Sequence, residues 1–243
     1  MKKAGVNGLG HIGCLVIRAT ILSGKVQIAL HGLHVKCDCT HGRFHGTVEA
    51  KSGRAMIHGN SVTVFQEHDP ANIKQVDAGV KNVAESIGVF TTAKKANAHL
   101  KGGAKCVIIS APSADASMFV MGVNHDKYDD TPKVVGNVSR STNCLALLAK
   151  VIHENVHIVE GHSACHQSYT EDREVWKDGR GTAQNILPAS TGADKIVGKT
   201  ILSRKLTEMA FHVPIPNISI VDLTCCLEKP AKYDDIKNVL LKA

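Results

Sequence analysis

The chain has 243 residues, of which 43% are apolar and 21% are charged. This balance is ordinary for a soluble globular protein, and the length suits one large domain or two modest ones. No apolar run reaches the length of a membrane span, and the first residues lead directly into a glycine motif without room for a signal peptide. We therefore expect a cytoplasmic protein.

The eight cysteines form no CxxC pair and lack a secretory context, so we interpret them as free thiols. The formal net charge of +7 would suit a polyanion such as RNA, but the lysines and arginines look scattered and no RNA- or DNA-binding motif is visible. The group His31, His34, Cys37 and Cys39 ends in a spacing tighter than structural zinc sites use. We predict no metal site.

Taken in chain order, residues 4–7 predict a strand, a helical pattern runs from Cys14 to about Gly24, and residues 26–30 predict a second strand. This order is typical of a dinucleotide-binding unit. Further β-like runs follow at residues 61–65, 88–90, 105–109 and 133–135. Strands that alternate with helix-length segments indicate an α/β fold with a parallel, doubly wound sheet.

The pattern changes after a helix-like stretch at residues 143–150. A second set of strands is predicted at 157–160 and 218–223, and an amphipathic helix begins at 233. We place a domain boundary near residue 137. The expected architecture is a Rossmann-type domain at 1–137 followed by an α+β domain at 138–243.

Five strings carry a family resemblance. They are GVNGLGHIG at 5–13, THGRFHG at 40–46, ISAPSAD at 109–115, DGRG with QNILPASTG at 178–192, and VDLT at 221–224. In order and spacing they closely resemble the phosphorylating, NAD-dependent glyceraldehyde-3-phosphate dehydrogenases, from residue 4 to residue 243. A single GxGxxG would be weak, but five strings in order are specific.

The resemblance implies a glycolytic oxidoreductase with an NAD domain, a catalytic domain and a homotetrameric assembly. In the family, a thiol adds to glyceraldehyde 3-phosphate, hydride passes to NAD, and the acyl group passes to inorganic phosphate. Residues 31–39 are shorter than the family pattern, and the chain stops before the family's last strands and helix. We therefore expect a partly deleted NAD domain and an incomplete catalytic domain.

The family's nucleophile lies in a Ser-Cys-Thr-Thr-Asn-Cys string, which here reads SRSTNC at 139–144. Arg140 stands at the nucleophile position, and a guanidinium cannot act as a nucleophile. Cys144 lies one helical turn further on and is expected to serve packing. The resemblance therefore implies an inactive family member, a pseudoenzyme.

The remaining site residues also depart from the family pattern. Either His162 or His166 could be the counterpart of the general base, with His166 favoured by its distance from Gly161. The uncharged phosphate contacts match Ser139, Ser141, Thr170, Thr191 and Gly192, whereas His212 replaces an arginine. Histidine is mostly neutral at cytosolic pH and lacks the bidentate donors of arginine.

The cofactor positions suggested by the resemblance are Asn7, Gly8, Leu9, Gly10, His11, Ile12, Gly13, His68 and Ser110. The acid that would bond the adenosine ribose about 20 residues after the glycine motif is missing. NAD is thus the expected cofactor, with weak or lost binding. The alternative role is a non-catalytic partner that binds RNA or protein and co-assembles with an intact paralogue.

Overall fold

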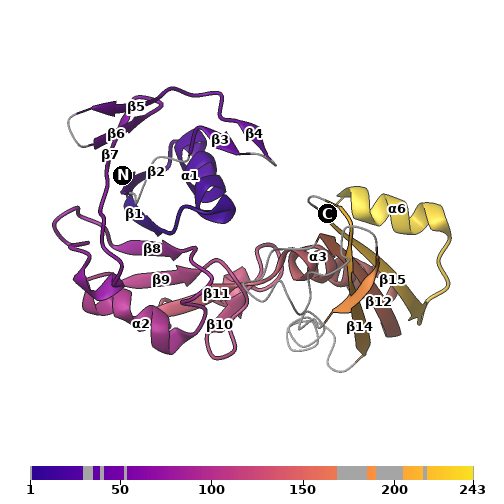
Figure 1. The fold of residues 1–243 in the computed structure, drawn as a ribbon. Coiled ribbons are helices and arrows are strands. Elements are labelled where there is room, and N and C mark those ends of the chain that lie inside the picture. The colour runs from indigo at the N-terminus through magenta and orange to yellow at the C-terminus, as the bar shows by residue number, and fades with distance from the viewer. Residues whose placement is uncertain are drawn as a thin grey trace. The chain divides into compact units, whose positions relative to one another are not determined.

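The computed structural model describes residues 2–29, 35–38, 41–51, 54–168, 185–189, 205–215 and 218–242. The chain divides into two compact units. The first comprises 1–119 with 128–137, and the second comprises 120–127 with 138–243. Figure 1 shows the elements of both units.

The first unit is built on a six-stranded sheet in the order β10-β11-β9-β8-β1-β2, in which every pair of neighbours is parallel. Its strands are β1 (Lys2–Asn7), β2 (Val26–Ala29), β8 (Asn82–Glu85), β9 (Cys106–Ile109), β10 (Ser117–Phe119) and β11 (Val134–Asn137). Its helices are α1 (His11–Ser23), α2 (Ala93–Lys101) and the short η1 (Pro70–Asn72). The predicted doubly wound sheet is confirmed.

The two main helices cover opposite faces of this sheet. Ile17 of α1 belongs to a core cluster with Val6 of β1, whereas Ala96 of α2 belongs to one with Val83 of β8. Because Val83 pairs with Gly5 and not with Val6, these two strand residues point to opposite sides. This is the layering of a Rossmann-type domain.

Two small sheets complete the first unit. One is the hairpin of β3 (Cys37–Asp38) and β4 (Gly42–Arg43), and the other is the meander of β5 (Val48–Lys51), β6 (Arg54–Ile57) and β7 (Asn60–Thr63). Ala55, Ile57 and Val62 of the meander join the α1 core cluster. The meander therefore packs against α1, and β7 contacts the edge strand β2 of the parallel sheet.

The second unit contains the mixed sheet β13-β14-β12-β15. Its elements are η2 (His125–Lys127), α3 (Arg140–Val156), β12 (Ile158–Ser168), β13 (Leu187–Ala189), β14 (Leu206–Val213), β15 (Ser219–Leu227) and α6 (Tyr233–Lys242). Leu145, Ala146 and Ala149 of α3 are fully buried. They place α3 against one face of the sheet, as an α+β layer requires.

The strand predicted at 88–90 is wrong. Gly88 and Val89 form a turn, and the strand lies at 82–85 instead. Asn82 and Glu85 break the apolar pattern of that strand, which hid it from periodicity. No helix among the described residues is long and apolar enough to span a membrane.

Candidate functional site

The glycine turn connects β1 to α1 in the first unit. Gly8 has a φ of +91°, a left-handed conformation that a side chain would strain. A Cβ on Gly13 would collide with the carbonyl oxygen of Gly8, so only glycine allows this close approach of helix and turn. Gly10 is the N-cap residue of α1 and has open space where its Cβ would lie. The turn thus presents bare backbone at a helix N-terminus, which suits a pyrophosphate.

Asn7, the last residue of β1, enters a buried polar network. Its Nδ2 donates to Oε2 of Glu85 at 2.7 Å, and Nε2 of His99 lies 2.7 Å from the same oxygen. The second carboxylate oxygen accepts the backbone N–H of Ile87 at 2.6 Å. Gln75 Nε2 lies 2.8 Å from the other ring nitrogen of His99.

This network fixes the loop that faces the glycine turn. Ser86 N donates to the carbonyl of Asn7 at 2.7 Å, and Ser110 N donates to that of Glu85 at 2.9 Å. Neither Glu85 nor His99 is among the residues predicted from the sequence. The signal that could have indicated them is an acidic residue at the end of a strand with a histidine on the following helix.

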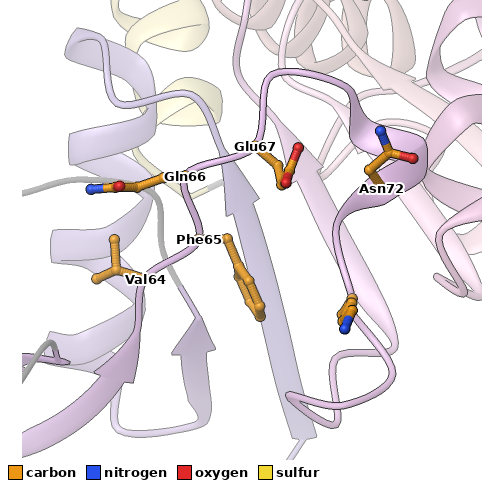
Figure 2. A pocket seen from close by; sticks show the side chains of 6 residues that line it. Val64, Phe65, Gln66, Glu67 and Asn72 are labelled. Carbon is orange, nitrogen blue, oxygen red and sulfur yellow. The ribbon is translucent and has the colours of Figure 1, made fainter.

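The other predicted cofactor residues lie on or near the surface. Leu9 packs against the α1 core, and His11 and Ile12 are exposed in the first turn of α1. His68 is exposed in the segment between β7 and η1. The adjoining residues line an open hollow of about 490 Å³, which Figure 2 shows; they are Val64, Phe65, Gln66, Glu67, Asn72 and Lys74. None of the predicted cofactor residues lines this hollow.

Among the described residues, no group of three or more His, Cys, Asp or Glu side chains could hold a metal ion. Of the His/Cys group, His31, His34 and Cys39 lie outside the described residues. The same holds for the predicted phosphate contacts Thr170, Thr191 and Gly192.

The start of α3 in the second unit holds the positions predicted for the nucleophile, Arg140, and for two phosphate contacts, Ser139 and Ser141. Ser139 is the N-cap residue, and its Oγ accepts the backbone N–H of Thr142 at 3.1 Å. Arg140 is the first helical residue, and its side chain is exposed. The positive charge of Arg140 is unfavourable beside the partial positive charge of the helix N-terminus. That partial charge would stabilise a thiolate instead.

Beneath this first turn lies Cys165, which is fully buried on β12. Its thiol donates to Oγ of Ser141 at 2.9 Å. Burial raises the pKa of Cys165, and the hydrogen bond to Ser141 offsets this only in part. Cys144, by contrast, is exposed on α3.

Both candidate base residues lie on the other face of β12. Side chains alternate along a strand, so His162 and His166 point away from the side on which Cys165 meets α3. His162 Nδ1 lies 3.0 Å from Thr207 Oγ1 on β14. His166 stacks on Phe211, with the ring centroids 5.6 Å apart and the planes at 21°. His212, next along β14, is partly buried.

Two family descriptions match the chain. The NAD binding domain of glyceraldehyde 3-phosphate dehydrogenase matches residues 2–93, and the C-terminal domain of the same enzyme matches residues 139–243. Four of the five strings lie inside these matches, and the string at 109–115 lies between them.

Three relatives illustrate the similarity. The chain is 56% identical to the glyceraldehyde-3-phosphate dehydrogenase of Danio rerio over all of this chain and 79% of the relative. It is 52% identical to the muscle enzyme of Jaculus orientalis, with 100% and 81% covered. For glyceraldehyde-3-phosphate dehydrogenase 2 of Drosophila melanogaster the identity is 54%, with 100% and 79% covered.

The alignment with the Danio rerio protein extends over 263 residues, more than the 243 residues of this chain. Within the aligned part, some residues of the relative therefore have no counterpart in this chain.

Proposed function

We propose, on the premise that this chain belongs to the glyceraldehyde-3-phosphate dehydrogenase family, that it keeps the family's domain plan without the family's thiol chemistry. The observation that carries the proposal is Arg140 as the first residue of α3, directly after the N-cap Ser139. The family reaction passes through a covalent bond to sulfur, and a guanidinium cannot form it.

Neither nearby thiol is a good replacement. Cys144 lies four residues along α3, about 6 Å further down the helix axis, whereas a misplacement of about 1 Å already slows catalysis steeply. Cys165 is fully buried, and burial raises the pKa of its thiol, so little thiolate forms. Both features support the absence of a working nucleophile.

NAD is the cofactor of this family, and the glycine turn of this chain fits the pyrophosphate of NAD. The left-handed Gly8 and the close approach of Gly13 leave the cradle that a pyrophosphate needs. Bound NAD would supply the hydride acceptor, while the chain's own backbone N–H groups at the start of α1 would hold its phosphates. The missing ribose acid leads us to expect weak binding.

The same proposal assigns residues 1–137 to an NAD-binding domain and residues 138–243 to a catalytic domain. It also places the protein in the cytoplasm, in agreement with the free thiols among the described cysteines.

The test is an NAD reduction assay on the purified full chain with glyceraldehyde 3-phosphate and phosphate. We expect no turnover, and none from Arg140→Cys, because the predicted base points away from α3. NAD affinity is measured separately by calorimetry. Turnover that disappears in Cys144→Ser would contradict the proposal, and normal turnover by Arg140→Cys would show that a single position was at fault.

A second candidate role is assembly with another copy of this chain or with an intact relative. The face of the mixed sheet opposite α3 leaves Met209 49% and Ile220 59% exposed. Ala164 pairs with Met209, and His166 with Ile220, so both apolar residues lie on the side away from Cys165. Exposed apolar surface of this kind is common at subunit interfaces.

Native mass spectrometry of the full chain, alone and mixed with an intact relative, tests this role. We expect oligomers that Met209→Glu weakens. The matched control is Leu22→Glu, at a residue of α1 that is 69% exposed. An assembly that responds equally to both changes, or a monomer in every mixture, would refute the role.

A further inference from the structure

The glycine turn packs against the two residues that follow β8, Ser86 and Ile87. A Cβ on Gly8 would lie 3.0 Å from the backbone nitrogen of Ile87, and a Cβ on Gly13 would lie 3.4 Å from the Cβ of Ser86. We call these two residues the 86–87 segment. Because it touches both glycines that shape the pyrophosphate cradle, a shift of this segment would change the cradle itself.

The 86–87 segment is held by the carboxylate of Glu85. Oε1 of Glu85 accepts the backbone N–H of Ile87 at 2.6 Å, and Oε2 accepts an N–H of Asn7 at 2.7 Å. The carbonyl of Asn7 in turn accepts the N–H of Ser86 at 2.7 Å. Glu85 is 1% exposed, so bulk water does not supply a donor that the protein lacks. The carboxylate therefore ties the end of β1 to the segment that follows β8.

A third donor to Glu85 comes from α2. Nε2 of His99 lies 2.7 Å from Oε2 of Glu85, and His99 is 0% exposed. The ring is held on two sides, because Nε2 of Gln75 lies 2.8 Å from its Nδ1 and the ring of Phe90 lies edge-on to it with centroids 6.5 Å apart. Since α1 and α2 cover opposite faces of the sheet, His99 links one face to the turn that begins the helix on the other.

The neighbours of the ring assign its hydrogen-bond roles. A carboxylate only accepts, so Nε2 of His99 carries the proton and donates to Glu85, and Nδ1 accepts the amide N–H of Gln75. Oε1 of Gln75 is buried and finds no partner among the described residues. An unsatisfied oxygen offsets the benefit of one hydrogen bond, so this amide adds little net stability. Its effect is to hold the ring in place.

We propose that His99 is a positioning residue for NAD binding, acting through Glu85 on the 86–87 segment. The inference rests on the proposed NAD binding at the glycine turn and extends it to α2, which lies outside the turn. Without the Nε2–H donor, the carboxylate loses a charge-assisted hydrogen bond and no longer holds the N–H of Ile87 in one geometry. A binding site must be held to about 0.5 Å by the residues behind it, so the cradle then loses affinity for pyrophosphate.

The test compares two replacements of His99 in the full chain. His99→Phe keeps a ring of similar size beside Phe90 but has no donor for Glu85. His99→Gln places an amide N–H close to the position of Nε2 and can donate. Calorimetry is expected to show that His99→Phe binds NAD about tenfold more weakly than the unchanged chain. His99→Gln is expected to restore the affinity to within about twofold.

Amide hydrogen exchange of the free chain gives a readout that a loss of overall stability does not imitate. Global destabilisation speeds the exchange of all protected amides by a common factor, whereas a positioning role predicts an additional increase at Ile87. The reference is Val107 of β9, whose N–H donates to the carbonyl of Lys133 at 2.8 Å. We expect His99→Phe to speed exchange at Ile87 at least about tenfold relative to Val107.

The matched control is Leu100→Ala, one residue further along α2. Leu100 packs against the core cluster that contains Ala96, and its apolar side chain takes no part in the network. The control is expected to lower the melting temperature while leaving NAD affinity, and the exchange of Ile87 relative to Val107, unchanged.

Gln75→Leu tests the same role with a variant that is expected to fold. It exchanges one unpartnered buried atom, Oε1 of Gln75, for another, Nδ1 of His99, so the number of unsatisfied groups stays the same. The ring loses its support but keeps its donor to Glu85. NAD binding is therefore expected to weaken only about threefold, with little change in melting temperature.

Three results would overturn the proposal. They are unchanged NAD affinity in His99→Phe, an equal loss in Leu100→Ala, or exchange at Ile87 that follows Val107 in every variant. No NAD binding by the unchanged chain would instead refute the cofactor part of the proposed function. In that case the exchange at Ile87, which is measured without NAD, still decides whether His99 holds the 86–87 segment.

Discussion

The thiol of Cys165 lies 2.9 Å from the hydroxyl of Ser141, directly beneath the first turn of α3. Ser141 follows Arg140, which we predict to stand at the family's nucleophile position. The side chain of Arg140 is exposed, whereas the thiol of Cys165 is buried under the helix. The two cysteines of this region, Cys144 and Cys165, are therefore expected to differ in reactivity, because only a thiolate that solvent can reach is readily alkylated.

Iodoacetamide labelling followed by peptide mass spectrometry measures that difference. We predict that Cys144 is modified at least about tenfold faster than Cys165 in the folded chain, and that the two rates converge in denaturant. Cys144→Ser serves as the control for assignment of the fast site. Equal rates in the folded chain would show that Cys165 is not held under α3.

The pair Glu85 and His99 predicts a large loss of stability on truncation. Both side chains are buried and 2.7 Å apart, and the carboxylate also accepts the N–H groups of Asn7 and Ile87. Leaving a buried hydrogen-bonding group without its partner costs about 1–3 kcal/mol, and more when that group is charged. We expect His99→Ala to lower the free energy of unfolding by that order, as measured by urea denaturation.

The comparison is Glu154→Ala, which breaks a pair with Lys150 that is 4.0 Å apart and whose side chains are 60% and 29% exposed. Exposed pairs contribute about 0–1 kcal/mol, so this variant should unfold at nearly the same urea concentration as the unchanged chain. If both variants lose the same stability, the buried network does not hold the turn.

Much of the first unit could be predicted from its local sequence. The segments around the glycine turn alternate between strand and helix patterns, and β1, α1, β2, β9 and β11 all lie where those patterns indicate. The strand β8 was missed because Asn82 and Glu85 interrupt its apolar pattern, and Glu85 is tolerated there only because Asn7, Ile87 and His99 supply its partners. Such compensation comes from tertiary structure.

In the second unit, the order of the strings indicated which residues correspond to the family's site. The face of β12 on which His166 lies depends on strand alternation relative to α3, which the sequence does not specify.

His153 predicts a pH dependence of stability. Burial lowers the pKa of His153, and the charges of Lys205 and His157 lower it further, against a weaker opposing effect of Glu154. Its Nδ1 accepts the backbone N–H of Ile158 at 3.1 Å, which requires an unprotonated nitrogen. The unfolded chain therefore binds this proton more readily than the folded chain.

The sign follows from that difference. The contribution of His153 is fully present above the ordinary histidine pKa of about 6.5 and is lost as the pH falls through the lowered value. Melting temperatures between about pH 8 and pH 5 measure it. His153→Gln keeps an acceptor without a titrating group and should show a smaller decrease, and an identical decrease would assign the effect to other groups.

Two glycines of the turn make a matched pair of predictions, because their surroundings differ in one respect. A Cβ at position 13 would collide with the carbonyl oxygen of Gly8, whereas a Cβ at position 10 would have nothing within 4 Å. Gly13→Ala must push α1 away from the turn and is expected to cost about 1–3 kcal/mol. Gly10→Ala, at a φ of −69°, is expected to cost less than about 1 kcal/mol.

Gly10→Ala, the change that costs less stability, is expected to be the one that blocks NAD binding. The open space beside Gly10 is where a pyrophosphate would approach the start of α1, so an added methyl group blocks the ligand without disturbing the fold. Gly10→Ala is therefore expected to abolish the NAD-induced rise in melting temperature while leaving the melting temperature of the free chain nearly unchanged. A retained NAD response in Gly10→Ala would mean that NAD does not approach this turn, because the methyl group lies across the path to the helix N-terminus.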